Sequence, residues 1–248
     1  SGWERIGITG TGTFNQTGGN ATVGNVYAGR TSGDGTILMS AGTLTVKASM
    51  FISGAASSET AGTGYGSQSG TSVVRFTGTG ENFRIGFGTI ISGVGPRGVY
   101  NMSGGTVALA TTSVGVIVGD GAFGTLNMSG GTISTAALNL GRNSGIGYTN
   151  FSGGTILLSN GVIVAGNAIT STGRSGTGTM VQSGDSFLQT ASSSNVGFGT
   201  TAPGAFGTYL FQGGTIRITG TGNNGLFVIG NSATGSGTGP RLIITGAS

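Results

Sequence analysis

Apolar side chains occur along this chain in short runs in which every second residue is apolar, and Gly, Ser, Thr or Asn bounds each run. Leu44 with Val46 and Ile156 with Leu158 are examples. Alternation of this kind places the apolar side chains on one face of a β-strand. Helix is disfavoured because Gly, Thr, Ser and β-branched residues dominate throughout. The pattern predicts an all-β chain built from many short strands.

One ten-residue string recurs along the chain. It reads Gly-Val-Tyr-Asn-Met-Ser-Gly-Gly-Thr-Val from Gly98 and Gly-Thr-Leu-Asn-Met-Ser-Gly-Gly-Thr-Ile from Gly124. Looser copies begin at Gly12, Gly35, Gly70, Gly147, Gly178, Gly207 and Gly239. These starts lie 23 to 35 residues apart, with a mean near 28. A period of this size with variable spacing is typical of a solenoid whose loops vary while its rungs do not.

Three short segments align inside each repeat, and the third ends in Gly, as at residues 116–119 and 138–141. We therefore expect a single parallel β-solenoid, or β-helix, of about nine rungs with three short strands each, Gly at the corners and roughly 4.8 Å between rungs. One domain would span residues 1–248, with an N-terminal half-rung at 1–11, eight internal repeats at 12–238 and a C-terminal half-rung at 239–248.

Each end of the chain matches part of a rung. Residues 4–7 (Glu-Arg-Ile-Gly) match residues 83–86 (Phe-Arg-Ile-Gly), a third strand, whereas a lone first strand follows Gly239. The two half-rungs are complementary, so we expect Ser1 to Gly10 of one copy to pair with Pro240 to Ser248 of the next by strand addition. The expected subunit interface, with Trp3 as its apolar anchor, consists of Trp3, Arg5, Ile6, Ile8, Arg241, Leu242, Ile243 and Ile244.

This pairing predicts an assembly. A solenoid exposes unpaired backbone groups at each end, and natural solenoids usually close them with a polar cap, a charge or a Pro. The sequence shows no capping helix or charged terminal repeat, and Pro240 is the only breaker. A head-to-tail contact does not close on itself, so we expect a homopolymeric filament. The alternative is a fragment of a longer repeat protein, with the half-rungs as its boundaries.

Four asparagines occupy the same position in their repeats: Asn15, Asn101, Asn127 and Asn150. Stacked rungs would place them in a structural ladder whose amides hydrogen-bond along the axis. The alternative is glycosylation, because each asparagine begins an N-x-S/T sequence. The repeated turn motif itself generates these sequences, so we expect the structural role.

Composition narrows the function further. The chain has 56 Gly but only 3 Pro and no strict triplet period, which excludes collagen. The 35 % hydrophobic content, arranged in strand-like runs, argues against disorder. There is no His and no Cys, so the familiar nucleophilic triads, imidazole or thiolate metal sites and disulfides are excluded. We expect no cofactor and no metal.

Charge is sparse. Ten cations and six anions are spread singly along the chain, so a nucleic-acid partner has little support. The chain contains no stretch of about 18 apolar residues, so the sequence does not predict membrane insertion. Enzymes of parallel β-helix type that cleave acidic polysaccharides need several carboxylates on neighbouring rungs. Six acids over nine rungs make such an enzyme a weak alternative, with Asp34, Asp120 and Asp185 as its testable residues.

The Gly-Thr-apolar-Asn-x-Ser-Gly-Gly-Thr strings, with third strands ending in Gly, resemble the β-strand repeats of large secreted bacterial proteins, the autotransporter-associated and PEP-CTERM-type repeat proteins. The resemblance implies export and a surface or matrix role, with no catalytic residues to carry over. The chain shows neither the membrane barrel of an autotransporter nor a C-terminal sorting helix.

We therefore expect an extracellular or cell-surface structural protein that polymerises into a β-solenoid fibre, with glycans or neighbouring fibres as further partners. Few charges would make such a fibre insensitive to pH and salt. The alternative is a surface adhesin, or part of an autotransporter passenger, that binds glycans or host surfaces through loops at one corner of the rungs. The loops expected there are Ala55 to Ser69, Phe87 to Arg97 and Asn167 to Thr177.

Overall fold

The computed structural model describes residues 2–78, 82–109, 115–164, 176–190, 195–198, 205–219, 227–229 and 241–245. Within these residues every regular element is a strand, which confirms the all-β prediction. The strands are β1 (Trp3–Ile6), β2 (Thr11–Val23), β3 (Asn25–Ala28), β4 (Asp34–Val46), β5 (Met50–Ile52), β6 (Thr63–Gln68), β7 (Val73–Phe76), β8 (Asn82–Phe87), β9 (Arg97–Ala108), β10 (Gly115–Asp120), β11 (Phe123–Arg142), β12 (Ile146–Val164), β13 (Gly176–Thr190), β14 (Asn195–Phe198), β15 (Ala205–Phe211), β16 (Thr215–Ile218), β17 (Phe227–Ile229) and β18 (Arg241–Ile244).

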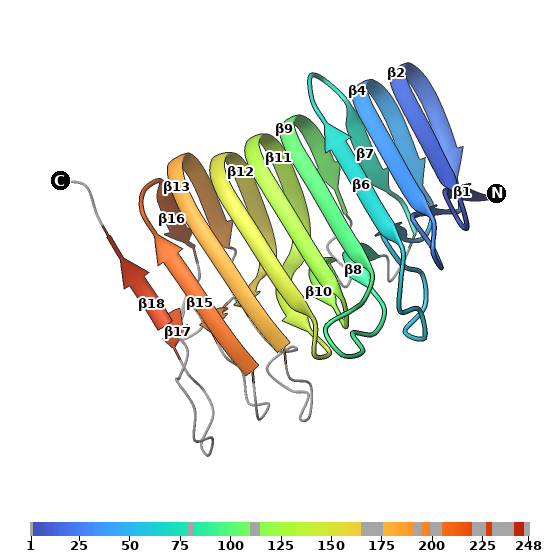
Figure 1. Ribbon diagram of the computed structural model, residues 1–248. Coiled ribbons are helices and arrows are strands. Elements are labelled where there is room, and N and C mark those ends of the chain that lie inside the picture. The colour runs from blue at the N-terminus through green and yellow to red at the C-terminus, as the bar shows by residue number, and fades with distance from the viewer. Residues whose placement is uncertain are drawn as a thin grey trace.

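The strands pair in parallel and form three ladders that run the length of the stack in Figure 1. We call one passage of the chain through the three ladders a coil. Within β11, residues 123–128 lie in the first ladder, residues 132–135 in the second and residues 137–140 in the third. The first and last strands, β1 and β18, lie at opposite ends of the stack (Figure 1).

Register follows the sequence repeat closely. Asn127 of β11 pairs with Asn101 of β9 and with Asn150 of β12, so equivalent positions of successive repeats lie side by side. Two starts of the repeat were predicted wrongly. Arg241 pairs with Thr208, one residue after Gly207, so the last start falls one residue after the predicted Gly239. Gly35 pairs with Gly64, and Gly64 with Gly98, so Gly64 holds the position that the sequence analysis gave to Gly70.

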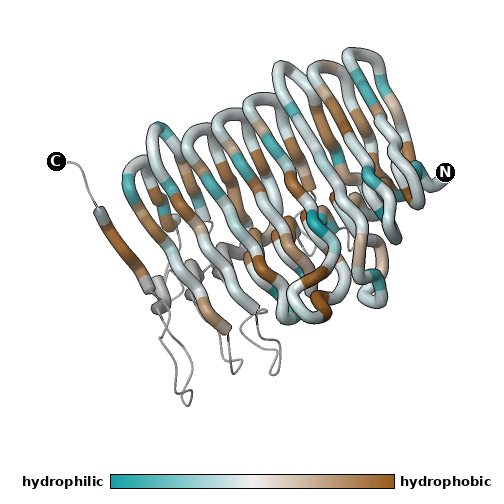
Figure 2. Tube along the Cα trace, in the orientation of Figure 1, coloured by the Kyte–Doolittle hydropathy of each residue, from teal (hydrophilic) through white to brown (hydrophobic). Residues whose placement is uncertain are grey.

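The core lies between the ladders and is built from the inward residue of each alternating pair. Figure 2 shows that apolar segments, in brown, recur along the strands of successive coils. Phe83 at its centre packs edge-on against Tyr100, with 4.9 Å between ring centroids. The largest fully buried side chains of the core are Tyr100, Tyr209, Phe83, Phe151, Ile37, Leu44, Met50, Ile52, Ile85 and Met102.

Two fully buried glutamines, which the sequence analysis did not identify, bind the coils together. Gln68 is fully buried; its Nε2 donates to the carbonyl of Thr106 at 2.9 Å, and its Oε1 accepts from the Tyr100 hydroxyl of the next coil at 2.6 Å. Gln182 repeats the arrangement with the hydroxyl of Tyr209. Because buried polar groups need partners, each glutamine and tyrosine depends on the other.

Glycine at the corner between the first and second ladders lets the coils approach closely. Gly42 has φ +81, and a Cβ added there would lie 2.3 Å from the carbonyl oxygen of Gly19 in the preceding coil. Gly131 and the Gly105 oxygen repeat the contact at 2.7 Å. Gly19 itself has φ +68 but no atom within 4 Å of an added Cβ, because it lies in the first complete coil. The close approach is therefore a property of the interface between coils.

Loops leave the stack mainly where the third ladder returns to the first. Residues 53–62 and 88–96 form two such loops (lower edge, Figure 1). The first loop is shorter than expected from the sequence, because residues 63–68 of the predicted loop form β6. The predicted loop from Asn167 to Thr177 lies largely outside the described residues.

Candidate interaction site at the ends of the stack

The two ends of the stack carry strand edges that are paired on one side only. At the N-terminal end, β1 pairs with β3, and β2 pairs with β4. At the C-terminal end, β16, β17 and β18 pair with β13, β14 and β15 respectively. The other edges of these five strands have no partner among the residues that the structure describes. Among these residues, each end therefore has backbone N–H and C=O groups without a strand partner in all three ladders.

The N-terminal face places its predicted interface residues on two sides of β1. Ile6 is buried in the core, whereas Trp3 and Arg5 lie on the outer side, Trp3 with 58 % of its surface exposed. The Arg5 guanidinium lies 4.9 Å from the Trp3 ring centroid. Ile8 follows β1 and is half-buried. Trp3 is thus available at the end face, but it lies beside the core rather than within it.

Trp3 ends a row of aromatic rings on the outer face of the third ladder. Ring centroids are 5.8 Å apart between Trp3 and Tyr27, 5.1 Å between Tyr27 and Phe51, and 5.7 Å between Phe51 and Phe87. Arginines cover the row: Arg84 stacks on Phe87 with 4.1 Å between the guanidinium carbon and the ring centroid. Such stacking favours contact with a further apolar or planar group at Trp3.

Glu4 is the unexpected residue of this face. It pairs in register with Val26, which is buried in the core. It also lies two residues from Ile6, so both side chains leave β1 on the core side. The sequence alignment of residues 4–7 with 83–86 already placed Glu4 at the position of Phe83. The sequence analysis found no charged terminal repeat and gave Glu4 no role, whereas the register places its charge at the core position of this strand.

The C-terminal face is apolar. In β18, Leu242 packs against the core, Ile243 is 39 % exposed and Ile244 is 66 % exposed. The register pairs Ile244 with Phe211, which also contacts the core. Arg241 pairs with Thr208, and its side chain lies outside the described residues. Ser1, Pro240 and residues 246–248 of the predicted interface also lie outside them.

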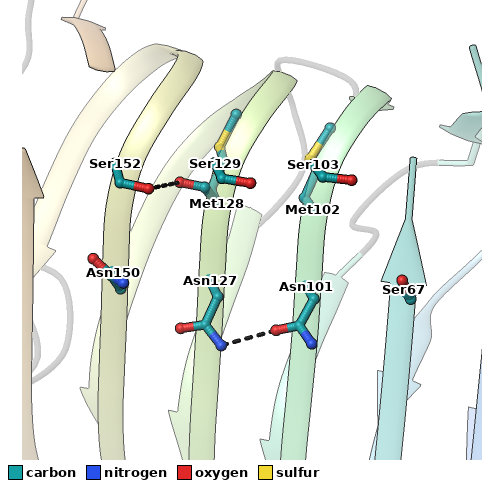
Figure 3. A pocket seen from close by; sticks show the side chains of 9 residues that line it. All are labelled: Ser67, Asn101, Met102, Ser103, Asn127, Met128, Ser129, Asn150 and Ser152. Atoms are coloured by element: carbon teal, nitrogen blue, oxygen red, sulfur yellow. Dashed lines mark hydrogen bonds between the residues drawn. The ribbon is translucent and has the colours of Figure 1, made fainter. Parts of the chain in front are cut away.

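Only three of the four asparagines that were predicted to form a row are neighbours in the structure. Asn127 donates to Asn101 at 2.8 Å, and Asn101 donates to the Tyr65 hydroxyl at 2.9 Å. Asn150 is next in register, whereas Leu38 and Ser67 occupy the column between Asn15 and Asn101. Figure 3 shows the three neighbouring asparagines along the outer face of the first ladder. They line a shallow groove of about 220 Å³ with Ser67, Met102, Ser103, Met128, Ser129 and Ser152.

The carboxylates proposed for the enzyme alternative lie in unlike surroundings. Asp34 and Asp185 are exposed. Asp120 is 1 % exposed; Arg84 Nη1 lies 3.4 Å from its Oδ2, Arg142 Nε lies 3.7 Å from its Oδ1, and Asn143 donates to it. Burial lowers the pKa of Arg84, and the attraction of Asp120 opposes this shift.

Metal chemistry has no candidate in the described part of the chain, where no three His, Cys, Asp or Glu side chains come together to hold an ion. Over the same residues, no helix has the length and apolar character needed to cross a bilayer. Comparisons with protein-family models, with curated proteins and with solved structures found no significant match. The functional argument therefore depends on the geometry of the chain itself.

Proposed function

We propose that this protein is an extracellular structural protein, a parallel β-solenoid that joins head to tail into a fibre. The observation that carries the proposal is the pair of open end faces, each with free strand edges in all three ladders. Unpaired edges of this kind pair readily with another chain. The sequence resemblance to secreted bacterial repeat proteins supports the extracellular location.

The solenoid assignment is supported by the order of pairing. The chain passes through the first, second and third ladders in turn before it returns to the first, as in β11 and then β12. Nine strands in the third ladder, from β1 to β17, correspond to the nine rungs expected from the sequence.

The proposed junction follows from continuing the ladders. In the first ladder, β18 of one copy pairs with residues 13–16 of β2 in the next copy. In the third ladder, β17 of the first copy pairs with β1 of the next. The shared coil thus takes its first strand from one copy and its third strand from the other. Because the two faces are different surfaces, the contact is heterologous and each addition creates a new end.

The proposed role requires no chemistry beyond pairing. The acids are dispersed, and Asp120 is held by two arginines, so we propose no enzymatic activity and no cofactor. The interface we propose is the set predicted from the sequence, with Ile6 and Leu242 at the core and Trp3 at its outer edge.

Electron microscopy of the purified chain, with two glycine variants, tests the proposal. A methyl group at Gly19 has room in a single chain, but it points toward the face on which the next copy would stack, as a Cβ at Gly42 points toward the Gly19 oxygen of the coil before it. We expect Gly19→Ala to abolish filaments. Gly93→Ala is the control, since Gly93 has φ +78 with open space around it, far from either end. Monodisperse short rods of the unaltered chain at both pH 7 and pH 3, or filaments of both variants alike, would contradict the proposal.

The adhesin remains a second candidate because of one loop. Ile91 and Val94 at the tip of the 88–96 loop are 57 % and 64 % exposed, and their backbones bond to each other. Two exposed apolar side chains on a held loop favour contact with another surface. Binding of the chain to glycan arrays or host cells that is lost in the Ile91→Ser, Val94→Ser double variant, with filament formation unchanged, would support this function.

A further inference from the structure

We propose that Glu4 is an electrostatic gate on head-to-tail assembly: its carboxylate opposes stacking on the N-terminal face, and its neutralisation by a proton permits it. The inference rests on the proposed fibre function and adds its regulation. We use the word column for the residues that pair in register through successive strands of one ladder. In the column of the third ladder that begins at Glu4, Glu4 is the only charged residue among the described strands.

The column is continuous through the molecule. By register, Glu4 is followed by Val26, Met50, Phe83, Val116, Leu138, Val162, Val196 and Phe227. The five members from Val26 to Leu138 are at most 1 % exposed and belong to the core. Glu4, at the open end, is partly exposed. In a single chain its carboxylate can keep contact with water.

Stacking would remove that contact. With the ladders continued, β17 of the preceding copy would lie against β1, and the Phe227 position would meet Glu4. The carboxylate would then lie in an apolar column with Val26 on its other side. A buried carboxylate without a partner is strongly disfavoured, whereas its protonated form is less costly to bury. Inward-pointing charges are a known way to protect strand edges from pairing.

No cation in the described strands near Glu4 lies on the core side to offset it. Strands β2 and β3 carry no charged residue, and β4 carries only Asp34, which is exposed. Arg5 lies on the outer side of β1 against Trp3, and Arg30 stacks on Tyr27 and bonds to Glu59.

The described side chains on the core side of the incoming face are also uncharged. On β16, Arg217 lies between Ile216 and Ile218, both of which contact the core, so Arg217 occupies an outward position. On β18, the described side chains, those of Leu242, Ile243 and Ile244, are uncharged. Among the described side chains of the two faces, none would compensate the charge of Glu4 at the junction.

The test measures the critical concentration for filament growth, by sedimentation and electron microscopy, for the full chain at pH 7 and at pH 3, where carboxyl groups are protonated. We expect the critical concentration of the unaltered chain to be at least about tenfold lower at pH 3. Glu4→Gln should assemble at pH 7 as the unaltered chain does at pH 3, and should lose most of the pH dependence. Asp185→Asn, which removes an exposed negative charge far from both ends, should behave like the unaltered chain.

The outcomes separate the gate from the fibre. If the unaltered chain and Glu4→Gln form filaments with equal critical concentrations at both pH values, the proposed fibre function is supported and the proposed role of Glu4 is wrong. If Glu4→Gln retains the pH dependence, another group is responsible and the gate is again wrong. If neither protein forms filaments at either pH while both give the circular dichroism of folded β-structure, the proposed function itself fails, and the gate with it.

Discussion

The first coil and the interior coils of this protein share the same ladders, yet they accept different residues. In the third ladder, the core position holds Glu4 at the open end and Val116 in the interior. At the first corner, Gly19 faces open space, while Gly42 lies against the carbonyl of the coil before it. The comparison shows that a position in a stack is defined by the coil on each side of it as much as by its own backbone.

Moving the charge inward should have the largest effect. Val116→Glu would place a carboxylate between Phe83 and Leu138, with no cation in that column. We expect the free energy of unfolding to fall by more than about 4 kcal/mol, which is in the range of the most damaging single substitutions. Urea denaturation followed by circular dichroism measures it. Glu4→Val, the reverse change at the end, should alter stability by less than about 1 kcal/mol; equal losses would remove the distinction between end and interior.

Removing the interior charge cluster should rank next. Asp120→Ala leaves the mostly buried Arg84 and Arg142 side chains without their shared counter-ion. We expect a loss of about 3–4 kcal/mol, typical of breaking a buried ion pair from one side. Asp34→Ala, in an exposed position of the second coil, should change stability by at most about 0.5 kcal/mol. The unfolding temperatures of the two variants, measured by thermal unfolding, provide the comparison. If Asp120→Ala were as stable as the unaltered protein, water would already screen the charges of the cluster.

The corner glycines give a more closely matched pair. Both Gly42→Ala and Gly19→Ala place a side chain at a positive φ, which costs about 1 kcal/mol. Only Gly42→Ala also forces the added methyl group against a carbonyl oxygen, so we expect a total loss of about 2–3 kcal/mol. Denaturant titration of the two variants at low protein concentration isolates this difference. A Gly19→Ala loss as large as that of Gly42→Ala would show that strain, rather than stacking, determines the corner.

The bond between coils at Tyr100 should have the smallest effect at neutral pH. Tyr100→Phe leaves the buried Gln68 Oε1 without its donor, at a cost of about 1–2 kcal/mol. The same residue produces a pH dependence, since burial raises the pKa of Tyr100 and of Tyr209. The unfolded chain loses these protons near pH 10 while the folded chain keeps them, so stability falls as the pH rises above about 10.

Tyr100→Phe should therefore flatten the alkaline part of the stability profile by up to about 1.4 kcal/mol for each pH unit above 10. The measurement is the urea midpoint between pH 8 and pH 11.5. An unchanged slope in Tyr100→Phe would mean that this hydroxyl is not buried in solution.

The sequence predicted the ladders because its repeat and its alternation agree, but it misplaced one repeat for a physical reason. At Gly66 an added Cβ would lie 2.3 Å from the Tyr100 ring, so the tyrosine of one coil fills the core position of its neighbour. The strand around Gly66 therefore lacks the apolar alternation that identified the others. The pattern within one repeat does not show that a side chain of the next coil, here Tyr100, fills the core space beside Gly66.

The candidate site was predicted in outline and missed in detail. Ile6 and Leu242 could be identified as core residues at the ends because their strands align with interior repeats. Glu4 was in the same alignment, but its meaning depends on the register with Val26. The asparagine row was predicted from repeat position. Leu38 already lay three residues after Gly35, as Asn15 does after Gly12, whereas Ser67 was hidden by the misplaced start at Gly70.

The direction of the hydrogen bonds has a mechanical consequence. Backbone bonds between coils run along the stack, while the covalent chain runs around it. A pulling force along the axis is therefore carried by hydrogen bonds and side-chain contacts between neighbouring coils, and the backbone takes the load only after a coil has opened. Resistance to stretching is consequently uneven along the molecule, greatest where a tyrosine such as Tyr100 reaches across to the coil before it.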